Sequence, residues 1–190
     1  MRELRTAVIA LVAVSLAFGL AYPLAMTGVA QVVTPGRADG SLLKRDGKVV
    51  GSKLIGQDFS RDLSYFQSRP SATKYSASAT FFNNQGPNQK ALADQLRKNL
   101  RAYMRRERLT DPRQVPSDAV TTSASGVDPD ISVANARIQS HRVAERRGLS
   151  RARVLKLIDA HTSKPLFGLG GQGSVNVLEL NLALDQETSR

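Results

Sequence analysis

The sequence predicts an α+β protein, in which one N-terminal transmembrane helix is followed by a single mixed α/β exported domain. Three observations lead to this prediction: a long uncharged run near the start, apolar runs separated by turn residues after residue 40, and helical apolar periodicity in the second half. We therefore divide the chain into a cytoplasmic stub and transmembrane helix (1–30), a linker (31–40) and a periplasmic α+β domain (41–190).

The first element is an apolar run from Thr6 to Met26 that contains no charged residue, and the next charge downstream is Arg37. At about 1.5 Å per residue it forms a helix of about 31 Å, which matches the hydrocarbon thickness of a bilayer. It is apolar on all sides, whereas a soluble amphipathic helix has a polar stripe. The residues assigned to the anchor include Thr6, Ala21, Tyr22, Pro23 and Met26.

The flanking charges indicate the orientation of this helix. Arg2 and Arg5 precede it with only Glu3 against them, and positive residues remain on the cytoplasmic side. Tyr22 and Pro23 then lie near the outer end, where an interfacial aromatic and a kink are tolerated. The N-terminus is therefore expected inside and the rest of the chain outside.

A cleaved signal peptide is the alternative, because Gly28 and Ala30 place small residues before Gln31. The apolar run is longer than the roughly 7–15 residues of a signal-peptide core, which favours an uncleaved anchor. The soluble part is exported in either case.

Composition narrows the possible functions. The 190 residues include no cysteine, so neither disulfides nor thiol chemistry are expected. The net charge of +11 would suit nucleic acid, but aromatics are only 5% and tryptophan is absent, which argues against a nucleic-acid partner. For an exported domain, anionic membrane lipid or an acidic protein face is the expected partner. With two histidines and no Walker A motif, neither a metal nor a directly bound nucleotide cofactor is expected.

The exported part begins with a predicted β-hairpin, Ser41–Arg45 and Lys48–Ile55. Asp46-Gly47 between these runs supplies the positive φ angles of a tight primed turn. Gly51 and Gly56 are expected to mark β-bulges.

Three helices are predicted after residue 87. In 88–108, Leu92, Leu96, Leu100 and Tyr103 recur at helical spacing on one face. The other face is basic and is interpreted as mainly solvated; it carries Arg97, Lys98, Arg101, Arg105, Arg106 and Arg108.

The other two helices have local start and stop signals. Ser132 is a good N-cap for a helix that runs to Arg147 and ends at Gly148, and Ser150 caps a helix from Arg151. Finally, 175–184 alternates apolar and polar residues and is predicted to be a half-buried strand, with a helix as the alternative.

The catalytic alternative is a membrane-anchored envelope hydrolase that would use Ser125 and His141. The sequence has no G-x-S-x-G elbow, and a surface role for each histidine is the simpler interpretation. The residues alone therefore indicate a single-pass, exported domain without a visible active site.

Five ordered motifs resemble one family, the C subunits of the bacterial Kdp potassium-transporting P-type ATPase. The likeness covers nearly the whole chain and includes Tyr22-Pro23 and Gly40-Ser-Leu42 at its start. The segment 78–85 departs from the Ser-Gly-Gly-Ser type that is usual in the family. The motifs are Gly51-Ser-x-Leu-Ile-Gly-Gln-x-Phe59, Tyr65-Phe-x-x-Arg-Pro-Ser-Ala72, Thr122-x-x-Ser-Gly-x-Asp-Pro-x-Ile131, Gln139-x-x-Arg-Val-Ala144 with Arg147-Gly148, and Val175-Asn-Val-Leu-x-Leu-Asn-Leu-Ala-Leu-Asp185.

The resemblance implies a non-catalytic subunit of a high-affinity potassium uptake pump in the bacterial inner membrane. Its partners would be a channel-like potassium-binding subunit, a P-type ATPase catalytic subunit and a small accessory subunit, and these would handle ATP and potassium. The C subunit is needed in this family for assembly and activity of the pump. It is described as a catalytic chaperone that increases the ATP affinity of the ATPase subunit. The family-motif residues are Gly51, Gln57, Phe59, Tyr65, Phe66, Arg69, Pro70, Ser125, Gly126, Asp128, Pro129, Gln139, Arg142, Asn176 and Asn181.

Overall fold

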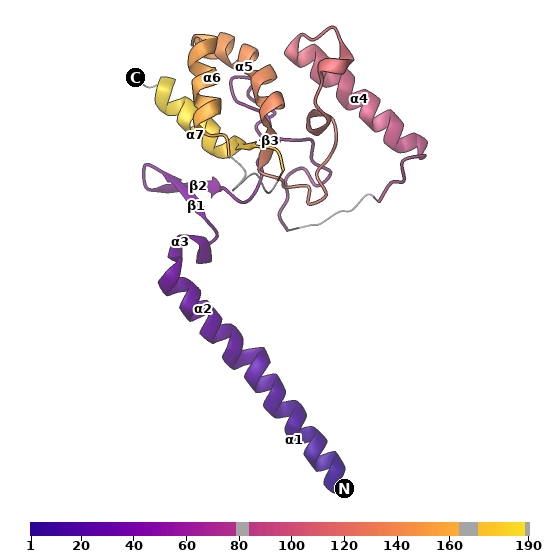
Figure 1. The fold of residues 1–190 in the computed structure, drawn as a ribbon, viewed down its shortest axis with the longest axis vertical. Coiled ribbons are helices and arrows are strands. Elements are labelled where there is room, and N and C mark those ends of the chain that lie inside the picture. Colours follow the sequence, from indigo (N-terminus) through magenta and orange to yellow (C-terminus); the bar gives the residue numbers. More distant parts are fainter. Residues whose placement is uncertain (79–83, 164–170, 189–190) are drawn as a thin grey trace. The chain divides into compact units, whose positions relative to one another are not determined.

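The computed structural model describes residues 1–78, 84–163 and 171–188 (Figure 1). The chain consists of two compact units, 1–52 and 53–190, which are described separately. The described part is mainly helical with two small antiparallel sheets, which confirms the predicted α+β class.

The first unit begins with a long apolar helix, Arg2–Val33, none of which is buried. It comprises α1 (Arg2–Leu16), a π-helical turn (Ala17–Ala21) and α2 (Tyr22–Val33). The π-helical turn ends two residues before Pro23, which has no N–H to donate and whose ring would meet the carbonyl of Gly19 in a regular α-helix.

The anchor residues Thr6, Ala21, Tyr22, Pro23 and Met26 all lie in this helix and are all exposed. The helix is long and apolar enough to cross a membrane, and it extends beyond the predicted run at both ends. Most of the segment assigned to the linker is helical, since α2 continues to Val33 and α3 (Pro35–Ala38) follows.

The predicted hairpin is confirmed as β1 (Leu42–Arg45) and β2 (Lys48–Ser52). Asp46 and Gly47 have φ angles of 51° and 76°, as the primed turn requires. Leu43 pairs with Gly51 but Lys44 pairs with Val49, so the ladder contains a bulge beside Gly51. The second bulge, expected at Gly56, is wrong, because Gly56 lies outside the strand.

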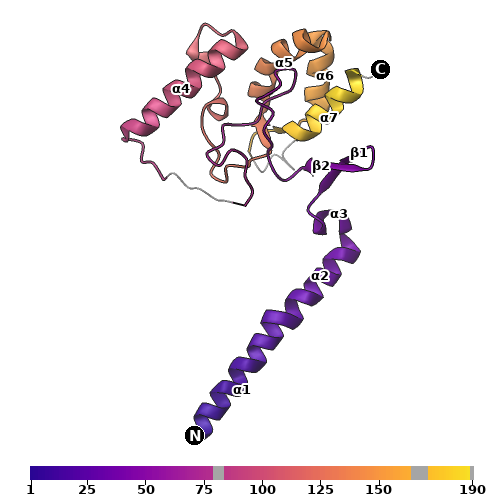
Figure 2. The same cartoon turned by 180° about the vertical axis from the view of Figure 1, so that it is seen from behind.

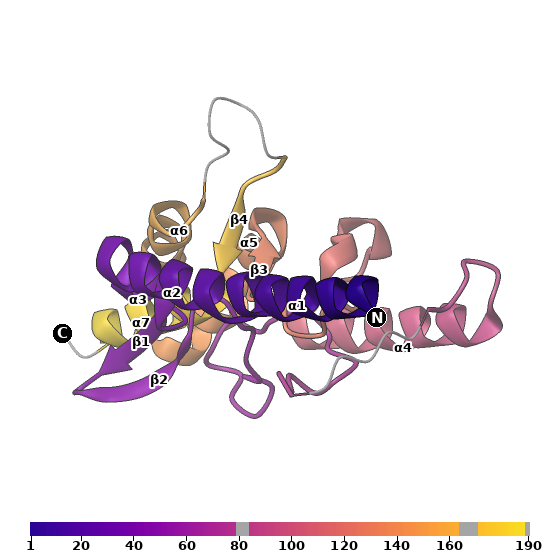
Figure 3. The same ribbon diagram turned by 90° about the horizontal axis from the view of Figure 1, so that it is seen from below.

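The second unit contains α4 (Lys90–Glu107), α5 (Val133–Arg147), α6 (Arg151–Ala160) and α7 (Val177–Thr188). Short 3₁₀ turns, Pro112–Gln114 and Ser117–Ala119, follow α4. The helices α5, α6 and α7 lie together, and α4 lies on the other side of this unit (Figures 1 and 2). Between them, β3 (Asp130–Ser132) pairs antiparallel with β4 (Ser174–Asn176) (Figure 3).

The predicted helix starts and stops are confirmed where they depend on local chemistry. The hydroxyl oxygens of Ser132 and Ser150 accept hydrogen bonds from the N–H groups of Asn135 (3.1 Å) and Arg153 (3.3 Å). Gly148 ends α5 with a φ of 64°, the left-handed conformation that glycine adopts without a Cβ clash.

The predicted last strand is wrong beyond Asn176, since the chain turns there into α7. The Asn176 carbonyl oxygen of the side chain accepts from the Glu179 N–H at 3.1 Å, as an N-cap does. The alternating leucines concealed the helical face, because two of its buried members, Asn181 and Asp185, are polar. The alternative, a helix through this region, is the correct one.

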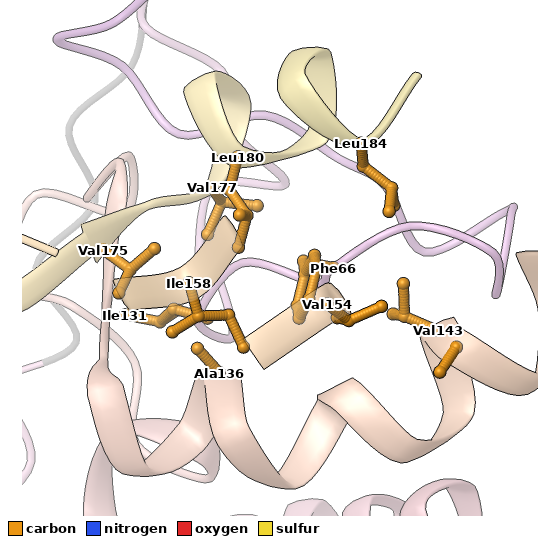
Figure 4. Packing of buried hydrophobic residues seen from close by; sticks show 11 residues of the cluster. Phe66, Ile131, Ala136, Val143, Val154, Ile158, Val175, Val177, Leu180 and Leu184 are labelled. Atoms are coloured by element: carbon orange, nitrogen blue, oxygen red, sulfur yellow. The ribbon is translucent and has the colours of Figure 1, made fainter. Parts of the chain in front are cut away.

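The core of the second unit forms around Phe66, which is fully buried among side chains of α5, α6 and α7 (Figure 4). Phe66 comes from an irregular segment, so this core joins a loop to three helices. Its other members include Ile131, Ala136, Val143, Val154, Ile158, Val175, Val177, Leu180 and Leu184.

The two serine caps give a first prediction. Replacing Ser150 with alanine should lower the free energy of unfolding by about 1 kcal/mol, because one N–H loses its acceptor. Ser132→Ala should cost about 2 kcal/mol, because the Ser132 hydroxyl also donates to Asp118 at 2.8 Å. Both losses are measured by urea titration of the full chain in detergent, with the near-ultraviolet circular dichroism of the tyrosines as the signal. Equal losses would show that the Asp118 contact contributes nothing.

Candidate functional site

The segment 63–67 is bound on several sides by buried polar side chains. Asn181 on α7 accepts from the Phe66 N–H (2.8 Å) and donates to the Phe66 carbonyl (3.0 Å). Gln139 on α5 does the same for Gln67, at 2.7 and 3.1 Å. Two side-chain amides therefore replace the neighbouring strand that would otherwise satisfy this buried backbone. We call this arrangement the amide clamp.

Arg142, one helical turn from Gln139, extends the amide clamp to α4. Its guanidinium donates to the carbonyl of Leu63, to that of Tyr65 (2.9 Å) and to the side-chain oxygen of Gln139 (2.9 Å). Its Nε faces both carboxylate oxygens of Glu107, at 3.1 and 3.2 Å. The Glu107 side chain is 0% exposed and that of Arg142 is 7% exposed, so this is a buried ion pair. Burial lowers the pKa of Arg142, and the Glu107 carboxylate opposes that change.

A polar row continues along α5 in the other direction. The side-chain oxygen of Asn135 accepts from Gln139 (3.0 Å) and from the Tyr103 hydroxyl (2.8 Å), and its amide donates to Asp118 (3.0 Å). Burial is the main cause that raises the pKa of Tyr103, so this hydroxyl remains a donor.

Tyr65 joins the same segment to the far end of α7. Its hydroxyl donates to Asp185 (3.0 Å), and Arg147 pairs with the other oxygen of that carboxylate (2.8 Å). The Arg147 guanidinium also lies over the Tyr65 ring, 4.4 Å from its centroid. The Phe59 ring also packs against the Tyr65 ring, tilted by 44° and with centroids 5.6 Å apart.

A second group of motif residues binds the loop around Arg69 to the turn before β3. Arg69 pairs with Asp128 at 2.8 Å, and the Arg69 carbonyl accepts from the Tyr75 hydroxyl at 2.6 Å. Burial raises the pKa of Tyr75 to about 12.

The Gly56 N–H donates to the Val127 carbonyl at 2.7 Å, and a Cβ on Gly56 would lie 2.3 Å from the Asp128 carbonyl oxygen. The glycine is therefore required by a close backbone approach, which replaces the bulge that we expected.

The remaining motif residues also serve the chain's own backbone. The Gln57 carbonyl accepts from Ser68, and the Gly126 carbonyl accepts from Ser71. The Pro129 carbonyl accepts from the Val177 N–H, and the Asn176 amide donates to the Lys53 carbonyl. Pro70 follows Arg69 in the same loop, and Gly51 belongs to the hairpin of the first unit.

The structure does not assemble Ser125 and His141 into a catalytic pair. The Ser125 hydroxyl accepts from the Val127 N–H at 3.2 Å, within its own turn. His141 is exposed on α5, in an open depression of about 420 Å³ with Glu107, Glu145 and basic residues, and Ser125 does not line it. Among the described residues there is also no group of three acidic or histidine side chains that could hold a metal ion.

Three members of the polar network were not expected from the sequence: Glu107, Asp118 and Asn135. Asn135 carried a usable signal, because it precedes Gln139 and Arg142 by four and seven residues and so shares their helix face. The departure in 78–85 falls mostly outside the described residues, since 79–83 are not part of the description.

Comparison with known proteins agrees with the motif order. The family model described as K+-transporting ATPase, c chain (KdpC) matches residues 4–186. The chain is 50% identical over 185 residues to the potassium-transporting ATPase KdpC subunit of Cereibacter sphaeroides, which covers 97% of each chain. It is 46% identical to that of Rhodopseudomonas palustris, with all of both chains covered. It is 50% identical to that of Caulobacter vibrioides, over 96% of this chain and 92% of the relative.

The amide clamp predicts that a minimal change at Asn181 is costly. Asn181→Asp keeps the acceptor for the Phe66 N–H but places a carboxylate against the Phe66 carbonyl. The free energy of unfolding should fall by about 2–4 kcal/mol. Gln186→Glu is the matched control, the same amide-to-acid change at an exposed site on the same helix, and should cost less than about 0.5 kcal/mol. Similar losses in urea titration would contradict the clamp.

The buried ion pair gives a third prediction. Glu107→Gln leaves the Arg142 charge buried without an anion, and should lower the free energy of unfolding by about 3 kcal/mol. Asp94→Asn is the control, because Asp94 is half exposed and pairs with Lys90 and Arg97 at the surface. That change should cost less than about 1 kcal/mol. A Glu107→Gln variant as stable as Asp94→Asn would remove the ion pair from the set of stabilising contacts.

Proposed function

The chain belongs to the KdpC family of potassium-transporting ATPase c chains, and from this membership we propose that it is a non-catalytic subunit that assembles and activates a high-affinity, ATP-driven potassium pump. The observation that carries the proposal is the match of the family model to residues 4–186, which includes both the apolar helix and the second unit. The proposed partners are a channel-like potassium-binding subunit, a P-type ATPase subunit and a small accessory subunit.

The apolar helix supports a membrane role. None of the residues in Arg2–Val33 is buried by the rest of the chain, so lipid or partner helices must cover them. We infer a single-pass protein of the inner membrane. The positive charges at Arg2 and Arg5 favour a cytoplasmic N-terminus and a periplasmic second unit.

The use of the motif side chains supports a non-catalytic role. Asn181, Gln139, Arg142 and Arg69 are engaged by backbone or by ion pairs inside the second unit. Such contacts preserve a shape, and a preserved shape suits a subunit that docks against others. We propose that the second unit caps the outer face of the channel-like subunit.

An effect on ATP affinity would then be indirect. A periplasmic unit does not meet the cytoplasmic nucleotide, so the proposed chaperone role is a coupling that passes through the partner subunits. It requires that this chain bind one conformation of the pump better than another.

Affinity purification tests the proposal. A tag after Arg190, used on membranes in mild detergent, should recover a P-type ATPase and a channel-like protein with potassium-stimulated ATPase activity. A Ser125→Ala/His141→Ala variant should recover the same proteins and support potassium uptake, since neither residue has a catalytic role here. Recovery of the chain alone would contradict the proposal and favour the envelope hydrolase. Loss of uptake in a well-folded double variant would contradict the non-catalytic role proposed for these two residues.

A further inference from the structure

The hairpin of the first unit exposes both cations and apolar side chains. Lys44, Arg45 and Lys48 are exposed, and Arg37 is exposed just before them on α3. Leu42 and Val49 are 48% and 53% exposed. A surface that carries both cations and apolar side chains suits the boundary between lipid headgroups and hydrocarbon.

The pairing of the strands places these side chains on defined faces. Lys44 is directly opposite Val49, and Leu42 lies two residues before Lys44 on the same strand. Directly opposed residues share a face, as do residues two apart, so Leu42, Lys44 and Val49 form one mixed face. Arg45 and Lys48 are opposed to each other on the second face.

Hydrogen bonds hold the hairpin close to the end of the apolar helix. The Gln31 amide donates to Asp39 at 3.0 Å, and the Ser41 N–H donates to the Gly36 carbonyl at 2.8 Å. The Ser52 hydroxyl donates to the Gly40 carbonyl at 2.6 Å, which ties the end of β2 to the start of the hairpin. The start of β1 and the end of β2 are therefore bonded to the short segment that follows Val33, where the apolar helix ends.

We propose that the hairpin Leu42–Ser52 lies in the membrane–water interface and binds the headgroups of anionic phospholipids. The proposal rests on the membrane span proposed above. The candidate span Arg2–Val33 is about 48 Å long, close to the roughly 40–45 Å of a bilayer with its headgroups, so a segment bonded to the end of this helix lies at the headgroup level. The cations meet lipid phosphates, Leu42 and Val49 enter the boundary region, and Lys44 extends its ammonium outward from the same face.

Lipid is a better match than an acidic protein surface for two reasons. The apolar and basic side chains are interspersed on one face, which fits the gradient between hydrocarbon and headgroup. The hairpin is also continuous with the apolar helix, so a bilayer that surrounds the helix is already present beside it. This interface also gives a use to part of the net charge of +11, which the pump role does not explain.

The absence of cysteine permits a specific probe. The full chain carrying Val49→Cys, labelled with an environment-sensitive fluorophore, is reconstituted in vesicles of phosphatidylcholine with or without phosphatidylglycerol. Phosphatidylglycerol should shift the emission to the blue and raise quenching by lipids labelled at a shallow depth. Adding Lys44→Gln and Lys48→Gln should weaken docking about fivefold per charge, because each surface cation contributes roughly 1 kcal/mol. High salt should act in the same direction.

The matched control removes two exposed cations from α4, Lys98→Gln and Arg101→Gln, and should leave the response of the Val49 probe unchanged. A response lost in this control but kept in the hairpin variant would overturn the proposal. The proposal would also be overturned if phosphatidylglycerol did not change the emission of the probe in vesicles and the probe were shielded only in the assembled pump. That result would show that a protein, and not lipid, covers the hairpin. A chain that does not float with vesicles would overturn the membrane span and this proposal together.

Discussion

The second unit depends on how the backbone of Phe66 and Gln67 is satisfied. Phe66 is fully buried, and its side chain draws an irregular segment into the core between α5 and α7. A buried peptide group without hydrogen-bond partners costs several kcal/mol. In the described part of the chain, no strand pairs with the segment that holds Phe66 and Gln67. The Asn181 amide supplies a donor and an acceptor to Phe66, and the Gln139 amide does the same for Gln67. The core and the amide clamp therefore require one another.

The ion pair of Glu107 with Arg142 joins α4 to the same segment. Apolar packing alone attaches this helix weakly, because Leu92, Leu96 and Leu100 are only partly buried. Removing two charges from water is expensive, and the attraction between them repays that cost only with good geometry and further hydrogen bonds. Arg142 has both, since it also donates to two carbonyls of the segment and to Gln139. A buried charge pair tolerates few alternative positions. It therefore both attaches α4 to the segment and determines where α4 lies.

The sequence predicted the features that depend on neighbouring residues. The caps of Ser132 and Ser150, the stop at Gly148 and the Asp46-Gly47 turn each need only a few adjacent positions. It failed at α7, because Asn181 and Asp185 are polar and lie on the buried face for reasons of tertiary structure. Gln139 and Arg142 were singled out by family resemblance alone, and nothing in their spacing disclosed that they bind the backbone of a loop some seventy residues earlier. Contacts between residues so far apart in the sequence can be identified only once the fold is known.

The internal use of the motif side chains bears on the proposed coupling to a partner ATPase. Packed side chains and hydrogen-bond networks in rigid elements are one way to carry a coupling between distant sites. A unit whose loop is hydrogen-bonded to α5 and α7 and ion-paired to α4 suits such a coupling better than one joined by apolar packing alone, because directional contacts resist sliding. Motif side chains that are engaged in contacts within the unit are the pattern expected where shape is the functional property.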